Sequence, residues 1–185
     1  MDKIEWQKNS LLFVLNMSSK KKQKIKIIFV CLGNICRSPI AEAVFKKIIE
    51  EKKLASEFFI DSAGTSGYHD GEMADPRTRR VAEQDGILIT HLSRKFNMSD
   101  FLNFDYIIAM DKTNVTTLNQ FARTEEERSK IKLFREFESG SKEHEVPDPY
   151  YGNTDSFIQV QKIVKIASNA FLSFLIDEHQ ISSIE

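Results

Sequence analysis

The stretch Ile27–Phe45, IIFVCLGNICRSPIAEAVF, joins an apolar run to a short polar loop and then to a helix-like segment. The four apolar residues before Cys31 predict a buried strand that ends at a thiol. Arg37 follows Cys31 after five residues, and Pro39 comes just after it, where a helix is expected to begin. A thiol at the exit of a strand, closely followed by an arginine, is the feature from which the fold and the chemistry are predicted.

The rest of the chain alternates between strand-like and helix-like patterns. The expected strands are Ile25–Val30, Phe58–Asp61, Phe104–Met110 and Lys130–Phe134, and the expected helices are Pro39–Lys52, Pro76–Gln84, Thr113–Phe121 and Asp155–Glu178. Asp75 is a good N-cap for the second of these helices. The alternation predicts a single-domain α/β fold, an open four-stranded parallel sheet with helices on both faces. A phosphate-binding loop is expected after the first strand.

In such a sheet, the loops that leave the carboxyl ends of the strands meet at one edge, where ligands bind. Cys31, Ser62 and Asp111 each follow an expected strand, and Asp148 lies downstream of the fourth. We therefore expect these side chains to converge, although Cys31 and Asp148 are 117 positions apart.

Composition restricts the kinds of partner. The chain has 26 Lys and Arg against 27 Asp and Glu, so its net charge of −1 favours neither a nucleic-acid nor a membrane partner. Its longest apolar runs are too short to span a bilayer. Residues 1–24 are expected to be a flexible N-terminal extension without the features of a signal peptide, and residues 25–180 the folded domain. The expectation is a cytoplasmic protein, monomeric or weakly dimeric, without membrane insertion.

Cys31 and Cys36 are the two cysteines of the chain. A disulfide between residues so close in sequence would constrain very little of the unfolded chain. No second Cys/His pair stands at the spacing of a zinc site, so no metal is expected. The two thiols are therefore to be explained by chemistry or by packing.

The residues between the two cysteines favour an anion-binding loop. Gly33 and Asn34 are residue types that tolerate left-handed backbone, so the loop can curl with several N–H groups pointing inward. A helix start adds further donors and a positive dipole end. Pro39 is expected at the first helical position, with the Ser38 hydroxyl as its cap.

The two ends of the loop, Cys31 and Arg37, carry the groups that could react with a bound phosphate. Arg37 offers a planar fork that suits two oxygens of a phosphate. The positive field also favours the thiolate of Cys31, which would then be a nucleophile aimed at phosphorus. For an isolated Cys-x5-Arg spacing, a buried thiol and a surface charge would be the simpler interpretation. A Walker loop is excluded, because no Gly-Lys-Ser/Thr ends the turn.

The longer string VCLGNICRSP resembles the signature of the low-molecular-weight protein tyrosine phosphatases. The strings DSAGTSGY, ADPRT, YIIAMDKTN and VPDPYYG resemble further blocks of that family, in the same order, and the likeness covers about residues 25–178. The resemblance implies a protein-tyrosine phosphatase that needs no metal or cofactor and forms a cysteinyl-phosphate intermediate. Its partner would be a phosphotyrosine-bearing protein.

The resemblance also assigns roles to residues of this chain. Cys31 would be the nucleophile, Arg37 the phosphate-binding arginine, and Asp148 the general acid that later acts as base. Ser62 and His91 would support the loop. The residues expected to bind substrate are Leu32, Gly33, Asn34, Ile35, Cys36, Ser38, Tyr68, Tyr150 and Tyr151. Without the resemblance, His91 would be an ordinary structural histidine and Pro-Asp-Pro a simple turn.

Asp111 is interpreted as a structural carboxylate.

Three other functions compete with that of a tyrosine phosphatase. Arsenate reductases of similar fold share the loop but need further cysteines, and this chain has none after Cys36. Protein-arginine phosphatases of this fold resemble GNTCRS, with threonine where this chain has Ile35. A catalytically silent phosphate-binding module is the third alternative, and it would be expected to have lost Cys31 or Asp148.

Overall fold

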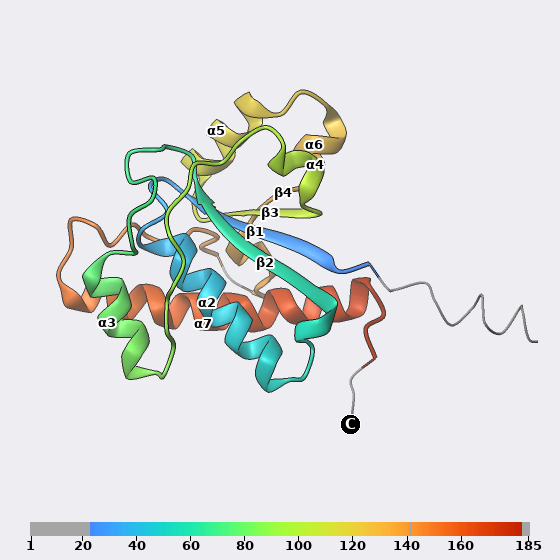
Figure 1. Cartoon of the computed structure of the whole chain (residues 1–185). Helices are drawn as coiled ribbons and strands as arrows, with labels where there is room; N and C mark the ends of the chain where they lie inside the picture. The colour runs from blue at the N-terminus through green and yellow to red at the C-terminus, as the bar shows by residue number, and fades with distance from the viewer. Residues whose placement is uncertain (1–22, 141, 183–185) are drawn as a thin grey trace, which may run out of the picture.

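The computed structural model describes residues 23–140 and 142–182. Its sheet has the order β2-β1-β3-β4, and every neighbouring pair is parallel. The strands are β1 (Ile25–Cys31), β2 (Phe58–Gly64), β3 (Tyr106–Ala109) and β4 (Ile131–Leu133). Figure 1 shows β1 in the middle of the sheet, flanked by β2 and β3. The predicted four-stranded parallel sheet is confirmed, with boundaries shifted by up to three residues.

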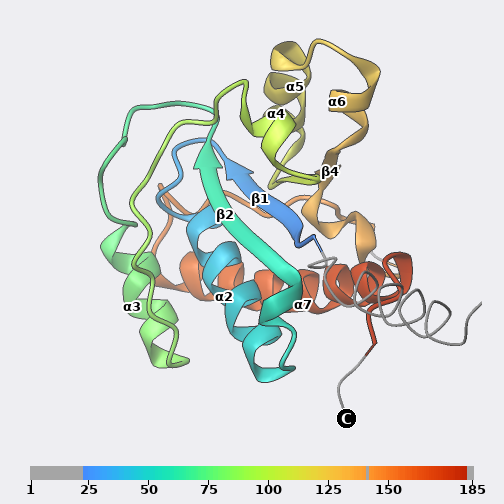
Figure 2. The ribbon, with the colours of Figure 1, turned by 45° about the vertical axis from the view of Figure 1, so that its right-hand side comes forward.

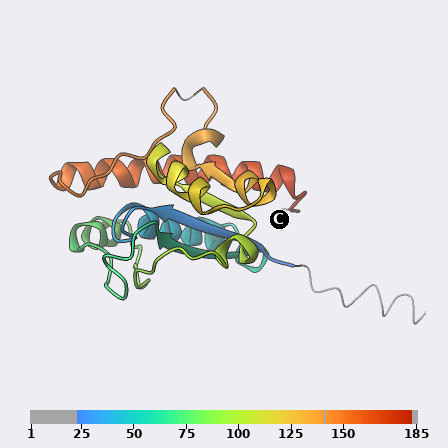
Figure 3. The same ribbon diagram turned by 90° about the horizontal axis from the view of Figure 1, so that it is seen from above.

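Helices cover both faces of this sheet, as predicted. They are α2 (Arg37–Glu51), α3 (Pro76–Gln84), α4 (Asp100–Asn103), α5 (Lys112–Phe121), α6 (Glu125–Ser129) and α7 (Thr154–Glu178), with 3-10 turns η1 (Ala55–Glu57) and η2 (Phe134–Phe137). Figures 1 and 2 show α2, α3 and α7 below the sheet and α4, α5 and α6 above it. Seen from above, α7 lies towards the β3–β4 side and α2 towards the β1–β2 side (Figure 3).

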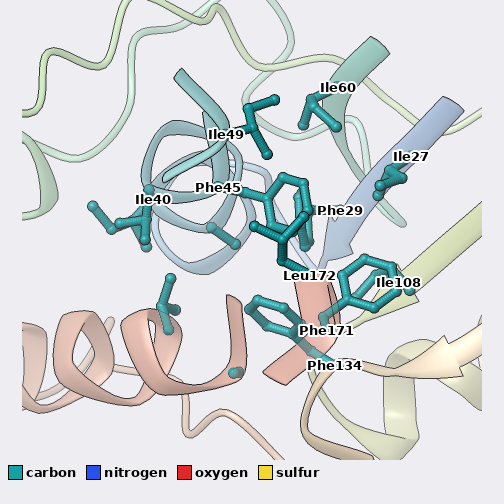
Figure 4. Close-up of a cluster of buried hydrophobic side chains, with 14 of the residues drawn as sticks. Ile27, Phe29, Ile40, Phe45, Ile49, Ile60, Ile108, Phe134, Phe171 and Leu172 are labelled. Atoms are coloured by element: carbon teal, nitrogen blue, oxygen red, sulfur yellow. The ribbon is translucent and has the colours of Figure 1, made fainter. Parts of the chain in front are cut away.

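The alternation of side chains along β1 divides the core into two layers. Ile27 and Phe29 point into the larger layer, which α2 and α7 complete. Ile28 and Val30 point into the smaller layer beneath α4 and α5. Figure 4 shows Phe29 at the centre of the larger layer, where its ring centroid lies 5.0 Å from that of Phe134. Burial of both faces explains why β1 is an almost unbroken apolar run.

This packing places the carboxyl end of β1 directly before the start of α2. The helix begins at Arg37, with Cys36 as N-cap and no side-chain cap. The expectations that Pro39 is the first helical residue and Ser38 its cap are therefore wrong. The Ser38 hydroxyl is instead engaged by the loop before the helix, as described below. Asp75 does cap α3, accepting a hydrogen bond from the Arg77 amide at 2.8 Å.

Two further predictions concern the ends of the chain. The boundary of the extension expected for residues 1–24 lies outside the described residues, apart from residues 23 and 24, and stays a prediction. Among the helices of the described segments, none is both long and apolar enough to cross a membrane.

Candidate active site

The loop after β1 opens into a cavity of about 320 Å³ at the carboxyl edge of the sheet. Cys31 and Arg37 line it from the loop and Asp148 from the segment before α7. The predicted convergence of residues far apart in sequence is therefore present for these three. Ser62 lies within β2, because that strand continues to Gly64, and its side chain faces the back of the loop.

The carbonyl groups of the loop are tied outward by neighbouring segments. The carbonyl of Cys31 accepts a hydrogen bond from the Thr65 amide at 2.8 Å. The carbonyl of Gly33 accepts one from the Ser93 hydroxyl at 3.1 Å, and that of Ile35 accepts one from the Asp75 amide at 2.8 Å. The C=O of one residue and the N–H of the next point in opposite directions across one peptide plane, so these contacts, with that of the Ser66 amide to the Leu32 carbonyl, turn the N–H groups of residues 32, 33, 34 and 36 inward.

The inward amides are available to a ligand. In residues 23–140 and 142–182, the backbone N–H groups of Gly33, Ile35 and Cys36 have no protein acceptor. Asn34 adopts left-handed backbone with φ of 54°, as predicted. Gly33 does not use the left-handed backbone that its residue type tolerates. A side chain on Gly33 would meet the His69 ring, since a Cβ there would lie 3.1 Å from its Cδ2.

The thiol of Cys31 is the centre of this arrangement. Its Sγ accepts a hydrogen bond from the Asn34 amide at 3.3 Å and lies 3.1 Å from the hydroxyl oxygen of Ser38. Ser38 Oγ in turn accepts a hydrogen bond from the Asn34 side-chain amide at 2.8 Å, and its one proton is shared between the sulfur and the Ala63 carbonyl, which lies 3.3 Å away. These contacts are the ones that a thiolate would require.

Both polar atoms of the Asn34 side chain have two hydrogen-bond partners each. Its Nδ2 donates a second hydrogen bond to Ser62 Oγ at 2.9 Å, and its Oδ1 accepts one from the Arg94 amide at 3.0 Å. His91 Nε2 lies 2.9 Å from the same oxygen, and since an amide oxygen only accepts, Nε2 is the donor. Ser62 and His91, the two predicted supporting residues, thus meet at one amide.

A buried carboxylate that sequence reasoning missed closes this network. Glu42 on α2 is 5% exposed, and its Oε2 accepts a hydrogen bond from Ser62 Oγ at 2.6 Å. The same oxygen lies 3.2 Å from His91 Nδ1, and Oε1 lies 2.5 Å from the Lys46 ammonium. A charged residue inside the apolar run Ile40–Phe45 was the available signal. Glu42 thus connects α2 to Ser62 and His91, the two residues that support the loop.

We expect Glu42→Ala to destabilise the protein by about 1–3 kcal/mol, because it leaves the buried hydroxyl of Ser62 without its acceptor. Urea unfolding, with kcat measured on the same samples, checks this. Glu50→Ala, on the exposed face of the same helix, is the control, and it should change stability by less than about 0.5 kcal/mol. Equal effects of the two substitutions would contradict the role given to Glu42.

Glu42, Asp61 and His91 place three potential ligand atoms within 4.8 Å of one another. The arrangement is better explained by hydrogen bonds than by a metal. Glu42 already accepts hydrogen bonds from Ser62 and Lys46, and Asp61 accepts one from the Arg94 guanidinium at 2.8 Å. The expectation of a metal-free site stays a prediction.

Arg37 is clamped between two carboxylates. Its Nη1 lies 2.5 Å from Asp111 Oδ2, and its Nη2 lies 2.7 Å from Asp148 Oδ2. Burial opposes the charge of Arg37, but Cys31, Asp148 and Asp111 together raise its pKa above the ordinary value. Asp111 also caps α5 through the Asn114 amide at 2.7 Å, so it is structural, as predicted, and it orients the guanidinium as well.

The second cysteine has a different environment. Burial, followed by the nearby carboxylate of Asp75, raises the pKa of the Cys36 thiol to about 12. Cys36 packs in an apolar cluster with Ile35, Val81 and Phe157. It is therefore a neutral thiol at physiological pH, in contrast to the thiolate that attack on phosphorus requires.

We expect peroxide to inactivate the protein by oxidising Cys31 to a sulfenic acid, which the Cys36 thiol then attacks to give a disulfide and water. Wild type should regain activity on thiol treatment, and Cys36→Ser should start fully active but recover less. Activity before and after peroxide, with intact-mass measurement, checks this. Equal recovery of the two proteins would exclude a protective role for Cys36.

Aromatic side chains surround the mouth of the cavity. Tyr68 is 86% and Tyr151 is 98% exposed, and Leu32 is half-exposed. Tyr150 is held more firmly, because Arg77 on α3 donates a hydrogen bond to its carbonyl at 3.0 Å and lies over its ring. All the predicted substrate-binding residues line the cavity except Asn34 and Ser38, which lie behind Cys31. Ser66 and His69, which also line it, were not predicted.

A larger groove of about 450 Å³ lies elsewhere, between α2 and residues 86–91. Its walls alternate lysine and glutamate side chains along α2, and neither the thiol nor the loop amides reach it. The smaller cavity at the sheet edge is therefore the candidate active site. The fold and this cavity together define an α/β protein with a thiol and an arginine facing a cavity suited to a phosphate-like anion.

Comparison with known proteins agrees with that class. The family model for low molecular weight phosphotyrosine protein phosphatases matches residues 26–181. A phosphatase of that name from Schizosaccharomyces pombe is 48% identical over 136 residues, 73% of this chain and 86% of the relative. The chain belongs to the low molecular weight phosphotyrosine protein phosphatase family and is a protein-tyrosine phosphatase.

Two solved structures extend the comparison. A protein tyrosine phosphatase from Entamoeba histolytica with Hepes in its active site superposes with a TM-score of 0.80 at 43% identity, covering 85% of this chain and 100% of that one. A Drosophila arginine phosphatase superposes with a TM-score of 0.77 at 30% identity, covering 82% and 98%. The fold alone therefore does not separate the two substrate classes.

Proposed function

We propose that the chain hydrolyses phosphotyrosine and related aryl phosphates through a cysteinyl-phosphate intermediate on Cys31. The observation that carries the proposal is the cavity in which the Cys31 sulfur, the Arg37 guanidinium and the inward loop amides face one anion-sized space. The Entamoeba structure gives further support, since Hepes carries a sulfonate, a tetrahedral oxyanion like phosphate.

In the first step, the Cys31 thiolate attacks phosphorus and the bond from phosphorus to the phenolic oxygen breaks. Asp148, as the carboxylic acid, gives its proton to that oxygen, so that a neutral phenol leaves. The phosphate must displace Asp148 from Arg37 Nη2, which releases the carboxyl group towards the leaving oxygen. Asp111 keeps its hold on Nη1 and so keeps the guanidinium in place.

In the second step, water attacks the phosphocysteine and Asp148, now a carboxylate, accepts the proton of the water. The bond from phosphorus to sulfur breaks, and inorganic phosphate and the thiolate are released. Both transition states carry extra negative charge on the phosphoryl oxygens, which the loop amides and Arg37 are placed to stabilise. The Ser38 hydroxyl and the Asn34 amide stabilise the departing thiolate.

The walls of the cavity favour an aryl substrate. Ile35 lines it with an apolar side chain where arginine phosphatases have threonine, and Leu32 and Tyr150 offer flat or apolar surface for an aromatic ring. Arginine phosphatase activity is the second candidate, because a protein named for it superposes closely on this chain.

The partner would be a phosphotyrosine-bearing protein, and the chain would act as a monomer or weak dimer in the cytoplasm. The near-neutral net charge and the use of both cysteines within the site support this setting.

Turnover of phosphotyrosine, phosphoarginine and arsenate, measured side by side on one preparation, tests the proposal. We expect the highest kcat/KM for phosphotyrosine and no arsenate reduction. A higher kcat/KM for phosphoarginine would replace the proposal by the second candidate. Binding of phosphate without turnover of any of the three would indicate a silent binding module.

A further inference from the structure

His69 lines the cavity, but the proposed mechanism gives it no role. It lies in the segment that links β2 to α3, and its side chain is 29% exposed. Its ring rests against the phosphate-binding loop, since a Cβ on Gly33 would lie 3.1 Å from Cδ2 and 3.8 Å from Nε2. The imidazole edge that carries Nε2 thus lies beside Gly33, which also lines the cavity.

The other ring nitrogen is fixed by a carboxylate. His69 Nδ1 lies 2.8 Å from Glu72 Oε2, and an ionised carboxylate can only accept a hydrogen bond. Nδ1 therefore carries the proton, and in the neutral ring Nε2 presents a lone pair. Within the part of the chain that the structure describes, this Nε2 has no hydrogen-bond partner. Because Glu72 fixes the tautomer, His69 presents Nε2 as a hydrogen-bond acceptor at the cavity, and we call this nitrogen the preset acceptor.

A preset acceptor selects the chemistry of its ligand. The substrate must bring an N–H or O–H, and an acidic neighbour of the phosphotyrosine would be repelled by the lone pair and by the Glu72 carboxylate that holds Nδ1. When the aromatic ring occupies the cavity, the groups of a peptide nearest its mouth are the main-chain amides around the phosphotyrosine. Every peptide carries these N–H groups, and a small aryl phosphate carries none.

We propose that His69 is a specificity-determining residue that accepts a hydrogen bond from a main-chain N–H of the phosphotyrosine peptide. The proposal rests on the proposed function, and it makes the site selective for phosphotyrosine within a peptide over phosphate esters of simple phenols. Leu32, Tyr68 and Tyr151 contribute apolar contact around the same mouth. The hydrogen bond to His69 then orients the bound peptide.

The test compares a phosphotyrosine peptide with the same peptide N-methylated at the phosphotyrosine and at the following residue. Assays of all proteins and peptides are run at the same pH, 8. For wild type we expect methylation to lower kcat/KM about 3- to 10-fold, the usual value of one net hydrogen bond. For His69→Phe, which keeps a flat ring over Gly33 but has no Nε2, we expect the methylation penalty to disappear.

A second variant protects the test against misfolding of the first. Glu72 is 60% exposed, and in Glu72→Gln the amide can donate to Nδ1, so the tautomer is no longer fixed and the penalty should shrink. An equal penalty in wild type and both variants would overturn the proposal. Wild-type turnover of p-nitrophenyl phosphate is measured in parallel, so that failure of the phosphatase function itself would be recognised separately.

Discussion

Cys31→Ser is expected to abolish turnover of every phosphate ester while leaving anion binding intact. A serine hydroxyl at this position is not ionised near neutral pH, so the nucleophile is lost. The donors remain, because Arg37 and the inward amides of the loop do not depend on the sulfur. Steady-state rates on p-nitrophenyl phosphate, together with calorimetric titration by phosphate and vanadate, measure the two properties separately.

Cys36→Ser is the matched control for this substitution. It changes the same atom type five positions along the same loop, in a thiol that is neutral at physiological pH. The control should therefore keep its activity. Substantial residual turnover by Cys31→Ser, once a contaminating enzyme has been excluded, would remove Cys31 from the role of nucleophile. Loss of phosphate binding together with turnover would indicate a collapsed loop.

The sequence predicts most of what lies in one continuous motif. The strand before Cys31, the loop and the helix after it have local causes: an unbroken apolar run, residues that tolerate unusual backbone, and the restart of an apolar helical face. Asp75 was predicted as a cap for the same kind of reason, because the hydrogen bond joins it to a residue two positions away. The short helices α4 and α6 were missed, since four or five residues carry no periodicity.

Residues whose role comes from tertiary contacts were predicted only through the family resemblance or not at all. His91 reaches Asn34 across 57 positions, and no local pattern indicates that contact. Glu42 and His69 show the same difficulty, because one looks like a solvated helix charge and the other like an ordinary loop histidine. Gly33 is a further example, because what distinguishes it in the structure is the close approach of the His69 ring and not left-handed backbone.

Asp148→Asn is expected to lower turnover of phosphotyrosine by about 10²–10⁴-fold, the usual contribution of general acid catalysis. Asparagine keeps the shape and the contact with Arg37 becomes weaker, but the transferable proton is gone. Asp148 lines the same cavity as Cys31 and lies 2.7 Å from the guanidinium, so it is close to where the leaving oxygen must be. Single-turnover and steady-state rates on the two proteins measure the loss.

The loss should depend on the leaving group. A phenolic oxygen such as that of tyrosine needs a proton as its bond to phosphorus breaks, whereas a strongly acidic phenol can leave as an anion. Formation of the phosphoenzyme from an activated aryl phosphate should therefore suffer much less. Because the second step loses its base, phosphocysteine should accumulate with the activated substrate, and intact-mass measurement on rapidly quenched samples would detect it.

The decisive measurement is the rate against the pKa of the leaving phenol for wild type and Asp148→Asn. A steeper dependence in the variant is expected, since more negative charge then builds up on the unprotonated oxygen. Asp111→Asn is the matched control, because Asp111 holds the other side of Arg37 at 2.5 Å. It should slow all substrates alike by loosening the guanidinium and leave the slope unchanged. Identical slopes for wild type and Asp148→Asn would place the proton donor elsewhere, and a steeper slope for Asp111→Asn would identify Asp111 as that donor.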